Sequence, residues 1–473
     1  MTDTTRRDFL KTAGSVAASG MAMSATSLAW GSPLGANDRL TAALIGAGRQ
    51  GTYDMLDHLR SGQVDVAAIC DVYQPNLQNA LNSARMNGAR APEAVADFRR
   101  ILDRKDIDIV IVGTPDHWHA PVMVMACQAG KDVYVEKPIC VHVDEGKKMV
   151  EAARRYNRVV QVGTQQRSGR SFQRAVELVW SGQIGRVEFV RTWNYGNEYP
   201  DGIGNPPDGN PPPGLDWDMW LGPAPQRPFN ANRFGVGDRW STFRYFWDYA
   251  GGMMTDWGVH LLDIVNWALR SDGPRVITAG GGKFLLRDNR ETPDTMQATF
   301  EYALSAPPAE AVREAEPGGG RAVPNQDPPG CVVVYENRTA NGNSMYGKGY
   351  GIEFHGTAGT LFVDREGFKL YPETRREHGK EVALAEAAEM QEEPNPHFNH
   401  VTNFLECVRT RRRPISDIEI GHRSTSVCLL ANVAYRSRQR LVWDLEKQQL
   451  LEGGRQAQDL LSYSYRAPWT LSV

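Results

Sequence analysis

Residues 39–51 read RLTAALIGAGRQG, and this stretch decides the fold of the first part of the chain. A short apolar strand runs into the loop Gly46-Ala47-Gly48-Arg49-Gln50-Gly51, and a helix-like segment, TYDMLDHLRSG, follows. A second apolar strand, VDVAAIC, is followed by Asp71, twenty residues past Gly51. Glycine is common, so Gly-x-Gly-x-x-Gly alone is weak evidence. The strand before it, the helix after it and an acid at this spacing are what a dinucleotide-binding unit requires.

This loop predicts how a nucleotide is held. Its glycines let the backbone turn tightly and approach a pyrophosphate at the helix N-terminus, where free N–H groups and the helix dipole favour an anion. Asp71 is expected to bind the adenosine ribose hydroxyls and to repel a 2′-phosphate, which favours NAD over NADP. The alternative is a glycine turn with a purely structural role. The cofactor-binding residues predicted in this unit are Gly46, Gly48, Arg49, Gln50, Gly51 and Asp71.

Strands and helices alternate through residues 38–165. The strands read IDIVIVGTPD, KDVYVEKP and RVVQVGTQ, and helical segments with polar and apolar faces separate them. Val/Ile-rich runs separated by such helices indicate a parallel sheet covered on both faces, here a Rossmann domain. Ligands of such sheets bind beyond the carboxyl ends of the strands. Further cofactor-binding residues expected there are Thr114, Pro115, His119, Glu136, Lys137 and Gln165.

Lys137 stands in the tripeptide Glu136-Lys137-Pro138. Pro138 disfavours helical geometry at the residue before it, so the lysine is held extended at the end of a strand. Its ammonium can then reach over a nicotinamide ring. The alternative is a surface lysine that caps a loop.

The segment YAGGMMTDWGVHLLDIVNWAL places Asp256 and His260 directly after Gly251 and Gly252. Residues four apart on a helix share a face, so the carboxylate is expected beside the imidazole, and Asp263 continues that face. Such a pair suits proton transfer, with the acid orienting the base. The alternative is a solvated polar stripe or a histidine buried for packing.

Taken together, AALIGAGRQG, TPDHWH, VEKP and GGMMTDWGVHLLD resemble the glucose–fructose oxidoreductase/inositol dehydrogenase (Gfo/Idh/MocA) family. The resemblance covers essentially the whole mature chain. It implies a Rossmann domain followed by a domain with a large, mostly antiparallel sheet, and oxidation or reduction of sugars, polyols or their derivatives. It also implies that Lys137 binds and orients the substrate and that Asp256 and His260 form the proton-transfer pair. Thr114, Pro115 and His119 match the segment that lines the nicotinamide end. Relatives are commonly dimers or tetramers, so a homo-oligomer is expected.

The second domain is predicted over residues 166–395, with helices and a tail over 396–473 that pack back on the rest. VEFVRTWNY alternates as a half-buried strand does. Residues 331–371 are predicted to be a meander with turns at Asn341-Gly342, at 356–359 and at Glu366-Gly367, in a sheet that can also supply a subunit interface. Two insertions, 196–250 and 305–330, interrupt the sheet, and the second is expected to be a mobile surface loop.

Aromatic residues in the first insertion have two interpretations. Trp217, Trp220, Trp240 and Trp247 either stack on sugar rings or hold the loop to the core. Three neighbours of the substrate are expected at the end of the alternating strand. They are Trp193, Asn194 and Tyr195. In the tail, His397, His400 and His422 are expected to be mostly structural.

The N-terminus begins TTRRDFLK and continues in an Ala/Ser/Gly/Met-rich run to about Trp30. This order is that of a twin-arginine export signal over residues 1–35, which predicts a periplasmic or otherwise extracytoplasmic protein. The net charge of −3 does not indicate nucleic-acid binding, and no apolar run is long enough for a permanent membrane span. The six cysteines are scattered, without metal-site spacing, so neither a metal site nor structural disulfides are expected.

Export constrains the function, because free NAD is scarce outside the cytoplasm. The first hypothesis is an NAD(P)-dependent oxidoreductase that moves hydride between a sugar, polyol or glycoside hydroxyl carbon and a tightly bound cofactor. The second is a redox-neutral glycosidase that oxidises, eliminates, adds water and reduces again, although VEKP does not match the motif of the best-known such relatives. A third is a carbohydrate- or NAD-binding module without catalysis.

Overall fold

The computed structural model describes residues 38–235, 241–304, 329–393 and 395–473. The predicted export signal, Trp240 and nearly all of the second insertion lie outside the described residues.

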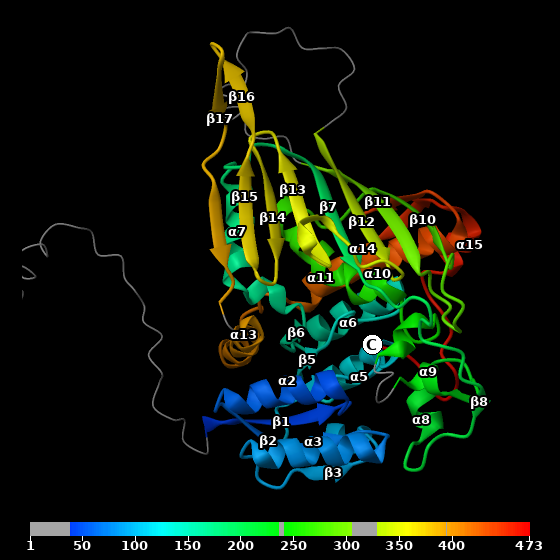
Figure 1. Cartoon of the computed structure of the whole chain (residues 1–473). Coiled ribbons are helices and arrows are strands. Elements are labelled where there is room, and N and C mark those ends of the chain that lie inside the picture. The colour runs from blue at the N-terminus through cyan, green and yellow to red at the C-terminus, as the bar shows by residue number, and fades with distance from the viewer. Residues whose placement is uncertain (1–37, 236–240, 305–328, 394) are drawn as a thin grey trace, which may run out of the picture. The chain divides into compact units, whose positions relative to one another are not determined.

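The first domain contains a six-stranded parallel sheet of order β3-β2-β1-β4-β5-β6. The strand order changes direction between β1 and β4, and this position is where doubly wound sheets bind their ligands. The Val/Ile-rich strands are buried on both faces because helices cover the sheet (Figure 1). The strands are β1 (Leu40–Ile45), β2 (Val64–Cys70), β3 (Glu93–Val95), β4 (Ile109–Val112), β5 (Asp132–Val135) and β6 (Val160–Val162). The helices are α2 (Arg49–Arg60), α3 (Gln74–Met86), α4 (Arg99–Asp103), α5 (Asp116–Gln128) and α6 (Val143–Arg155).

The second domain contains a ten-stranded sheet of order β18-β15-β14-β13-β7-β12-β11-β10-β19-β20. All its pairs are antiparallel except β7 with β12, so the predicted fold class is confirmed. The strands on one side of the centre are β7 (Val187–Tyr195), β13 (Tyr350–Gly356), β14 (Gly359–Asp364), β15 (Gly367–Pro372) and β18 (Ala388–Gln391). Those on the other side are β12 (Gly330–Arg338), β11 (Thr295–Ala303), β10 (Val276–Gly282), β19 (Leu441–Asp444) and β20 (Gln449–Glu452).

The predicted meander needs one correction. β13, β14 and β15 follow each other as antiparallel neighbours, but β7 lies between β12 and β13. Asn341-Gly342 is therefore not a two-residue hairpin turn between adjacent strands. A turn signal reports local backbone bending and does not identify the strand that enters the gap.

The two faces of the second sheet have different surroundings. Helices α7 (Arg170–Trp180), α11 (Gly258–Leu269) and α14 (Ile418–Ser437) cover one face (Figure 1). Val190 of β7 belongs to the apolar core on this face together with Ile352 and Phe354 of β13. Because successive strand residues point to opposite faces, Thr192 and Asn194 share the helix side with Val190.

The last long helices return to the first domain. α13 (Pro396–Thr410) packs on α2, and α14 packs on α6 and α11. His397 at the start of α13 donates from Nδ1 to Asp57 Oδ2 at 2.6 Å and from Nε2 to Asp54 Oδ1 at 3.0 Å. All three side chains are buried, so an imidazolium holds α13 against the cofactor-domain helix α2.

This buried ion triad predicts a stability that depends on pH. Burial alone lowers the pKa of His397, but Asp54 and Asp57 outweigh it and raise the pKa to about 10. The folded pKa exceeds the unfolded value of about 6.5, so the stabilisation is full below that pH and is lost as the pH rises through 10. His397→Gln is expected to cost about 3–5 kcal/mol near pH 7.

Denaturant unfolding of the wild type and the variant at pH 7 and pH 10 measures this effect. His58 is a matched control because it lies in the same cluster but stays neutral, its pKa lowered to about 4 by burial. His58→Gln should leave the pH slope between 7 and 10 unchanged. An equal slope in His397→Gln and the wild type would contradict the triad's role.

The first insertion folds as a separate apolar cluster against the first domain. Trp217 and Trp220, in α8 (Trp217–Leu221), stack on each other at 4.7 Å between ring centroids. Backbone bonds tie the insertion to the start of α3, from Gln74 N to Gly214 O at 2.9 Å and from Asp216 N to Val72 O at 3.0 Å. The packing interpretation therefore holds for the buried Trp217.

Three further features concern classes of function. Within the described ranges, no helix combines the length and the apolar character that a membrane crossing needs. The same ranges contain no cluster of three metal-ligating side chains. All six cysteines are buried and unpaired.

Candidate active site

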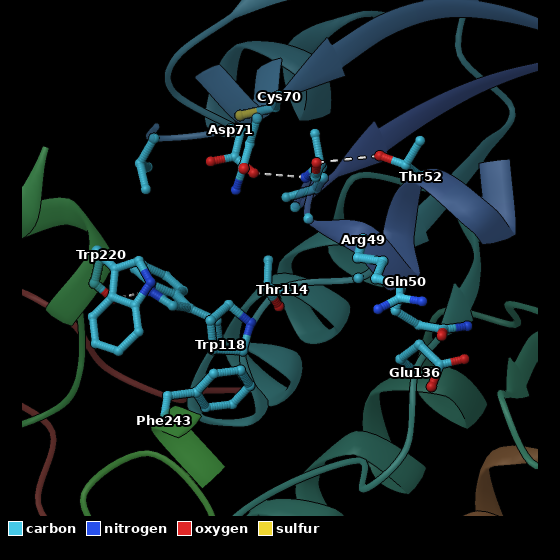
Figure 2. Close-up of a pocket in the computed structure, with 18 of the residues that line it drawn as sticks. Arg49, Gln50, Thr52, Cys70, Asp71, Thr114, Trp118, Glu136, Trp220 and Phe243 are labelled. Carbon is cyan, nitrogen blue, oxygen red and sulfur yellow. Dashed lines mark hydrogen bonds between the residues drawn. The ribbon is translucent and has the colours of Figure 1, made fainter. Parts of the chain in front are cut away.

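A cavity of about 480 Å³ opens at the carboxyl ends of β1, β2, β4 and β5. One side comes from the glycine loop and α3, and the other from α5 and the first insertion. Figure 2 shows the rings of Trp118, Trp220 and Phe243 and the carboxylates of Asp71 and Glu136 around this space. Of the predicted cofactor residues, the cavity is lined by Gly46, Gly48, Arg49, Gln50, Asp71, Thr114, Pro115, His119, Glu136 and Lys137.

The three glycines of the loop have different surroundings, and only one of them leaves open space for an anion. Gly46 has φ +89°, and a Cβ there would lie 2.5 Å from Thr114 N. A Cβ on Gly48 would meet nothing within 4 Å, so its open side faces the cavity that it lines. Gly51 does not line the cavity; a Cβ there would lie 2.1 Å from Gly46 O, so it serves close packing of α2. No side chain caps the start of α2, which leaves its first amides for a phosphate group.

These glycines predict two separable defects. Gly48→Ala should fold as the wild type does but bind NAD at least about tenfold more weakly, since the methyl enters the space for the pyrophosphate. Gly51→Ala should lower the melting temperature, because its Cβ clashes with backbone that has no rotamer to change. Thermal unfolding and calorimetric NAD titration distinguish the two. Gly209→Ala, with free space at an exposed site, is the control, and normal NAD affinity in Gly48→Ala would contradict this assignment.

Asp71 closes the loop from the end of β2. Its carboxylate accepts from Ala47 N at 2.7 Å and from Tyr73 N at 2.8 Å (Figure 2 shows the first bond). Burial raises the pKa of Asp71 to about 6, while the Tyr73 and Ala47 amides act in the opposite direction. The group is mostly ionised at neutral pH, and each oxygen retains a lone pair for a ribose hydroxyl.

An aromatic wall completes the cavity, and it includes Trp220, for which the sequence left a binding and a packing interpretation open. Trp118 Nε1 and His117 Nε2 donate to Trp220 O at 2.9 and 3.0 Å, which fixes the insertion to α5. Trp220 and Phe243 then line the cavity from the insertion side. Signals for this wall exist in TPDHWH and in the aromatic-rich insertion, but only packing brings them together.

Lys137 joins the two domains at the end of β5. Its Nζ donates to Asp256 Oδ1 at 2.8 Å and to Asp256 O at 3.0 Å. Arg244 Nε lies 2.9 Å from the same Oδ1. Burial alone raises the pKa of Asp256, but Arg244 and Lys137 outweigh it and hold the pKa well below its usual range. Lys137 and Arg244 both line the cavity, and no role for Arg244 was predicted from the sequence.

His260 lies in the same cluster but is not bonded to Asp256. α10 (Gly252–Asp256) ends at Asp256 and α11 begins at Gly258, so Trp257 interrupts the predicted single helix. The imidazole is buried and is not part of the cavity wall, and its Nδ1 has no hydrogen-bond partner among the described residues. Burial, followed by the charges of Lys137, Arg365 and Arg244, lowers the pKa of His260 well below its usual value. The ring is therefore neutral at physiological pH.

Asp263 does not continue the reactive face. It is fully buried and pairs with Arg167, with Nε to Oδ2 at 2.7 Å, and it accepts from Ser424 Oγ at 2.6 Å. This carboxylate joins α11 to α14 and to the segment after β6. Gln165, in that same segment, does not line the cavity, so the structure does not place it with the other cofactor residues.

The three predicted substrate neighbours on β7 separate. Trp193 stacks on Phe362 at 5.9 Å and on Tyr195 at 6.4 Å, on the sheet face opposite the helices. Only Asn194 faces the helix side, where its register partner Tyr350 lies 4.6 Å from the Trp257 ring. This placement corrects the expectation for Trp193 and Tyr195, because consecutive strand residues cannot face one ligand.

Two further carboxyl groups line the cavity near Lys137. Burial raises the pKa of Asp116 to about 7, with Arg244 and Lys137 acting against it. Burial and the charge of Asp54 raise the pKa of Glu136 to about 8. Glu136 is thus mostly protonated at neutral pH, and Asp116 is half ionised.

A Rossmann domain with an uncapped glycine loop, and a sheet domain that delivers Asp256 to the lysine of the first domain, define a two-domain nicotinamide-dependent oxidoreductase. The sequence agrees. Residues 40–164 match the description "Oxidoreductase family, NAD-binding Rossmann fold", and residues 192–279 and 358–471 match "Oxidoreductase family, C-terminal alpha/beta domain". The chain belongs to the Gfo/Idh/MocA family.

Relatives within reach of sequence comparison are distant. A "Glycosyl hydrolase family 109 protein" of Shewanella pealeana is 29% identical over 201 residues, which are 38% of this chain and 44% of the relative. The chain thus matches less than half the length of this relative. Solved structures share the fold over most of the chain. The WlbA dehydrogenase of Bordetella pertussis, in complex with NADH and UDP-GlcNAcA, has a TM-score of 0.58 at 18% identity and covers 86% of this chain and 99% of its own. The aldose-aldose oxidoreductase of Caulobacter crescentus has a TM-score of 0.58 at 19% identity and covers 85% and 99%.

Proposed function

We propose that the protein is an exported, NAD-dependent oxidoreductase that transfers hydride between the hydroxyl carbon of a sugar, polyol or glycoside and a retained cofactor. The observation that carries the proposal is the Lys137 ammonium, which lines the cofactor cavity and is bonded to Asp256 of the second domain at 2.8 Å. NAD is favoured over NADP because Asp71 lies at the end of β2 with its carboxylate held by two backbone amides.

The side chains divide the chemistry between them. A nicotinamide cofactor held by the glycine loop and Asp71 would supply the acceptor for the hydride of the carbinol carbon and would return it in the reverse direction. Lys137 donates to the substrate oxygen and stabilises the negative charge that develops as its proton leaves. Neutral His260 is the proton acceptor of the cluster. Asp256 orients Lys137 and balances its charge.

Cofactor retention is supported by the way the first insertion is held. Trp220 and Phe243 line the cavity, and the C-terminal tail holds the same insertion, with Arg466 Nε donating to Gly222 O at 2.9 Å. Trp469 of the tail packs edge-on against Trp118 at 4.7 Å. The first insertion is thus held both by α5 and by the C-terminal tail. Such a fixed cavity wall suits an enzyme that reduces and reoxidises one bound cofactor, as an exported protein needs.

A redox-neutral glycosidase is the second candidate, and a specific observation favours it. The Shewanella pealeana relative that matches in sequence carries the name of a glycosyl hydrolase family. Oxidation next to a glycosidic carbon acidifies a C–H, so elimination, water addition and hydride return would use the same Lys137 and His260. Periplasmic location and a homo-oligomeric state remain part of the proposal.

One absorbance experiment tests both candidates. The purified protein is scanned at 340 nm with panels of sugars and glycosides, and its bound cofactor is identified by mass spectrometry. A 340 nm band with a sugar supports net oxidation, whereas aglycone release without a lasting band supports the closed cycle. Protein that carries no nicotinamide cofactor and is silent across both panels would favour a binding module and contradict the proposal.

A further inference from the structure

The cluster around Asp256 includes residues that do not line the cofactor cavity. Asp256, Trp257, Tyr350 and Arg365 are each partly exposed, although none of them lines the cavity. The rings of Trp257 and Tyr350 lie 4.6 Å apart. These residues bring groups of the sheet domain to the Lys137–Asp256 pair, and the charge of Arg365 acts on the Asp256 carboxylate.

Arg365 lies in the hairpin turn between β14 and β15. Its guanidinium lies 4.9 Å above the Trp257 ring and 5.9 Å from the Tyr350 ring. Its Nε donates to Gln166 Oε1 at 3.3 Å, and Gln166 Nε2 in turn donates to His260 O at 3.1 Å. Through Gln166, these two hydrogen bonds connect the Nε of Arg365 to the backbone of His260.

The remaining donors of Arg365 have no carboxylate. Among the residues that the structure places, no acid lies within 4 Å of this guanidinium. The acids on either side of it in the turn are already engaged, since Lys348 Nζ lies 3.3 Å from Asp364 Oδ2 and 2.5 Å from Glu366 Oε2. A guanidinium carries five N–H donors, and a planar anion satisfies two of them at once.

The charge balance of the cluster also favours an anionic ligand. Lys137 and Arg365 contribute two positive charges near Asp256, and within the described residues Asp256 is the one carboxylate that forms an ion pair with either of them. Glu136 is mostly protonated at neutral pH and Asp116 half ionised, so the excess of positive charge persists. Partly buried positive charge of this kind favours an anionic group over a neutral hydroxyl.

A row of polar residues continues across the sheet from Tyr350, which lies beside the arginine. Asn337 of β12 pairs in register with Asn194 of β7, which pairs with Tyr350 of β13. The Nδ2 of Asn337 is buried and finds no partner within the described part of the chain. A hydroxylated ring on this row would meet an amide donor, two aromatic faces and the guanidinium.

We propose that Arg365 binds a carboxylate on the substrate, so that the preferred substrates are sugar acids, namely uronates or their glycosides. This inference rests on the proposed function, because it names the substrate class of the same site. A phosphate ester offers a similar anion to the guanidinium, and the experiment separates the two.

The test measures kcat/KM of the holoenzyme at 340 nm for glucuronate against glucose, galacturonate against galactose, and glucose 6-phosphate. The acid should be preferred over the matched neutral sugar by roughly 10–100-fold. Arg365→Gln should reduce that preference at least about tenfold, mainly through KM, and Arg365→Lys should restore part of it, since a lysine keeps the charge but not the planar fork. Arg270→Gln is the matched control, because Arg270 also lies over a tryptophan ring, at 4.5 Å from Trp180, outside the site.

Two outcomes would overturn the inference while leaving the proposed function intact. One is equal turnover of acids and neutral sugars, and the other is an equal loss for both in Arg365→Gln, which indicates a structural arginine. A preference for glucose 6-phosphate over glucuronate would overturn the carboxylate assignment. If no sugar is oxidised, calorimetric titration of the holoenzyme with glucuronate still decides: binding that Arg365→Gln abolishes supports the site, and no binding overturns it.

Discussion

Lys137→Met is expected to lower kcat for sugar oxidation by about 10³-fold while the cofactor stays bound. In the proposed reaction the ammonium donates to the substrate oxygen, and methionine keeps its length and apolar stem without its charge. Asp256 would keep Arg244 at 2.9 Å, so the carboxylate is not left without a cation. Single-turnover reduction at 340 nm measures the chemical step directly.

Cofactor occupancy has to be checked in the same samples. Trp118 and Trp220 line the cavity, so quenching of tryptophan fluorescence reports bound nicotinamide. Lys137→Arg should not recover the rate, because a planar guanidinium does not replace a point charge in this position. A Lys137→Met enzyme within tenfold of the wild-type rate, with full cofactor, would remove the lysine from the reaction.

His260→Ala is expected to lower kcat by about 10²–10⁴-fold with the cofactor still bound, because the cluster loses its proton acceptor. The pKa of His260 is lowered well below 6.5, so the basic form persists across neutral pH. A base works in its deprotonated form, and wild-type kcat/KM should therefore fall only as the pH drops below the usual histidine range.

His355→Gln is the control for this variant, because His355 is a partly exposed histidine on the helix-free face of the second sheet. The rate and the pH profile of His355→Gln should match the wild type. Near wild-type turnover in His260→Ala would instead support the interpretation of His260 as a packing histidine and would direct the search for the base to Asp116.

Local chain geometry explains why the cofactor domain could be predicted from the sequence. The strand, glycine loop and helix of residues 39–60 each depend on residues a few positions apart, and the structure has β1, the loop and α2 where the sequence placed them. Lys137 was predictable for the same reason, since the proline beside it restricts its backbone. The alternating pattern of β7 was also local, and it predicted a strand correctly.

The partners of these residues were not local. Asp256 was expected to orient His260 four residues away, but it bonds to Lys137, 119 positions distant, and to Arg244 of the insertion. Helical spacing predicts on which face of a helix a residue lies, but it does not predict which cation from a distant segment packs against that face. The alternation in β7 likewise predicted a strand without showing which face the helices cover, so it did not show that Trp193 and Tyr195 lie on the face opposite Asn194.

The sequence by itself determined a Rossmann domain with its glycine loop, and it predicted that Lys137, Asp256 and His260 carry the redox chemistry. Tertiary structure alone decided that Arg244 shares Asp256, that the first insertion covers the cavity, and that Arg365 reaches the cluster from a hairpin turn. The physical reason is the separation along the sequence of the residues that interact. Backbone conformation follows from neighbouring residues, whereas charge pairing and cavity walls depend on which distant segments pack together.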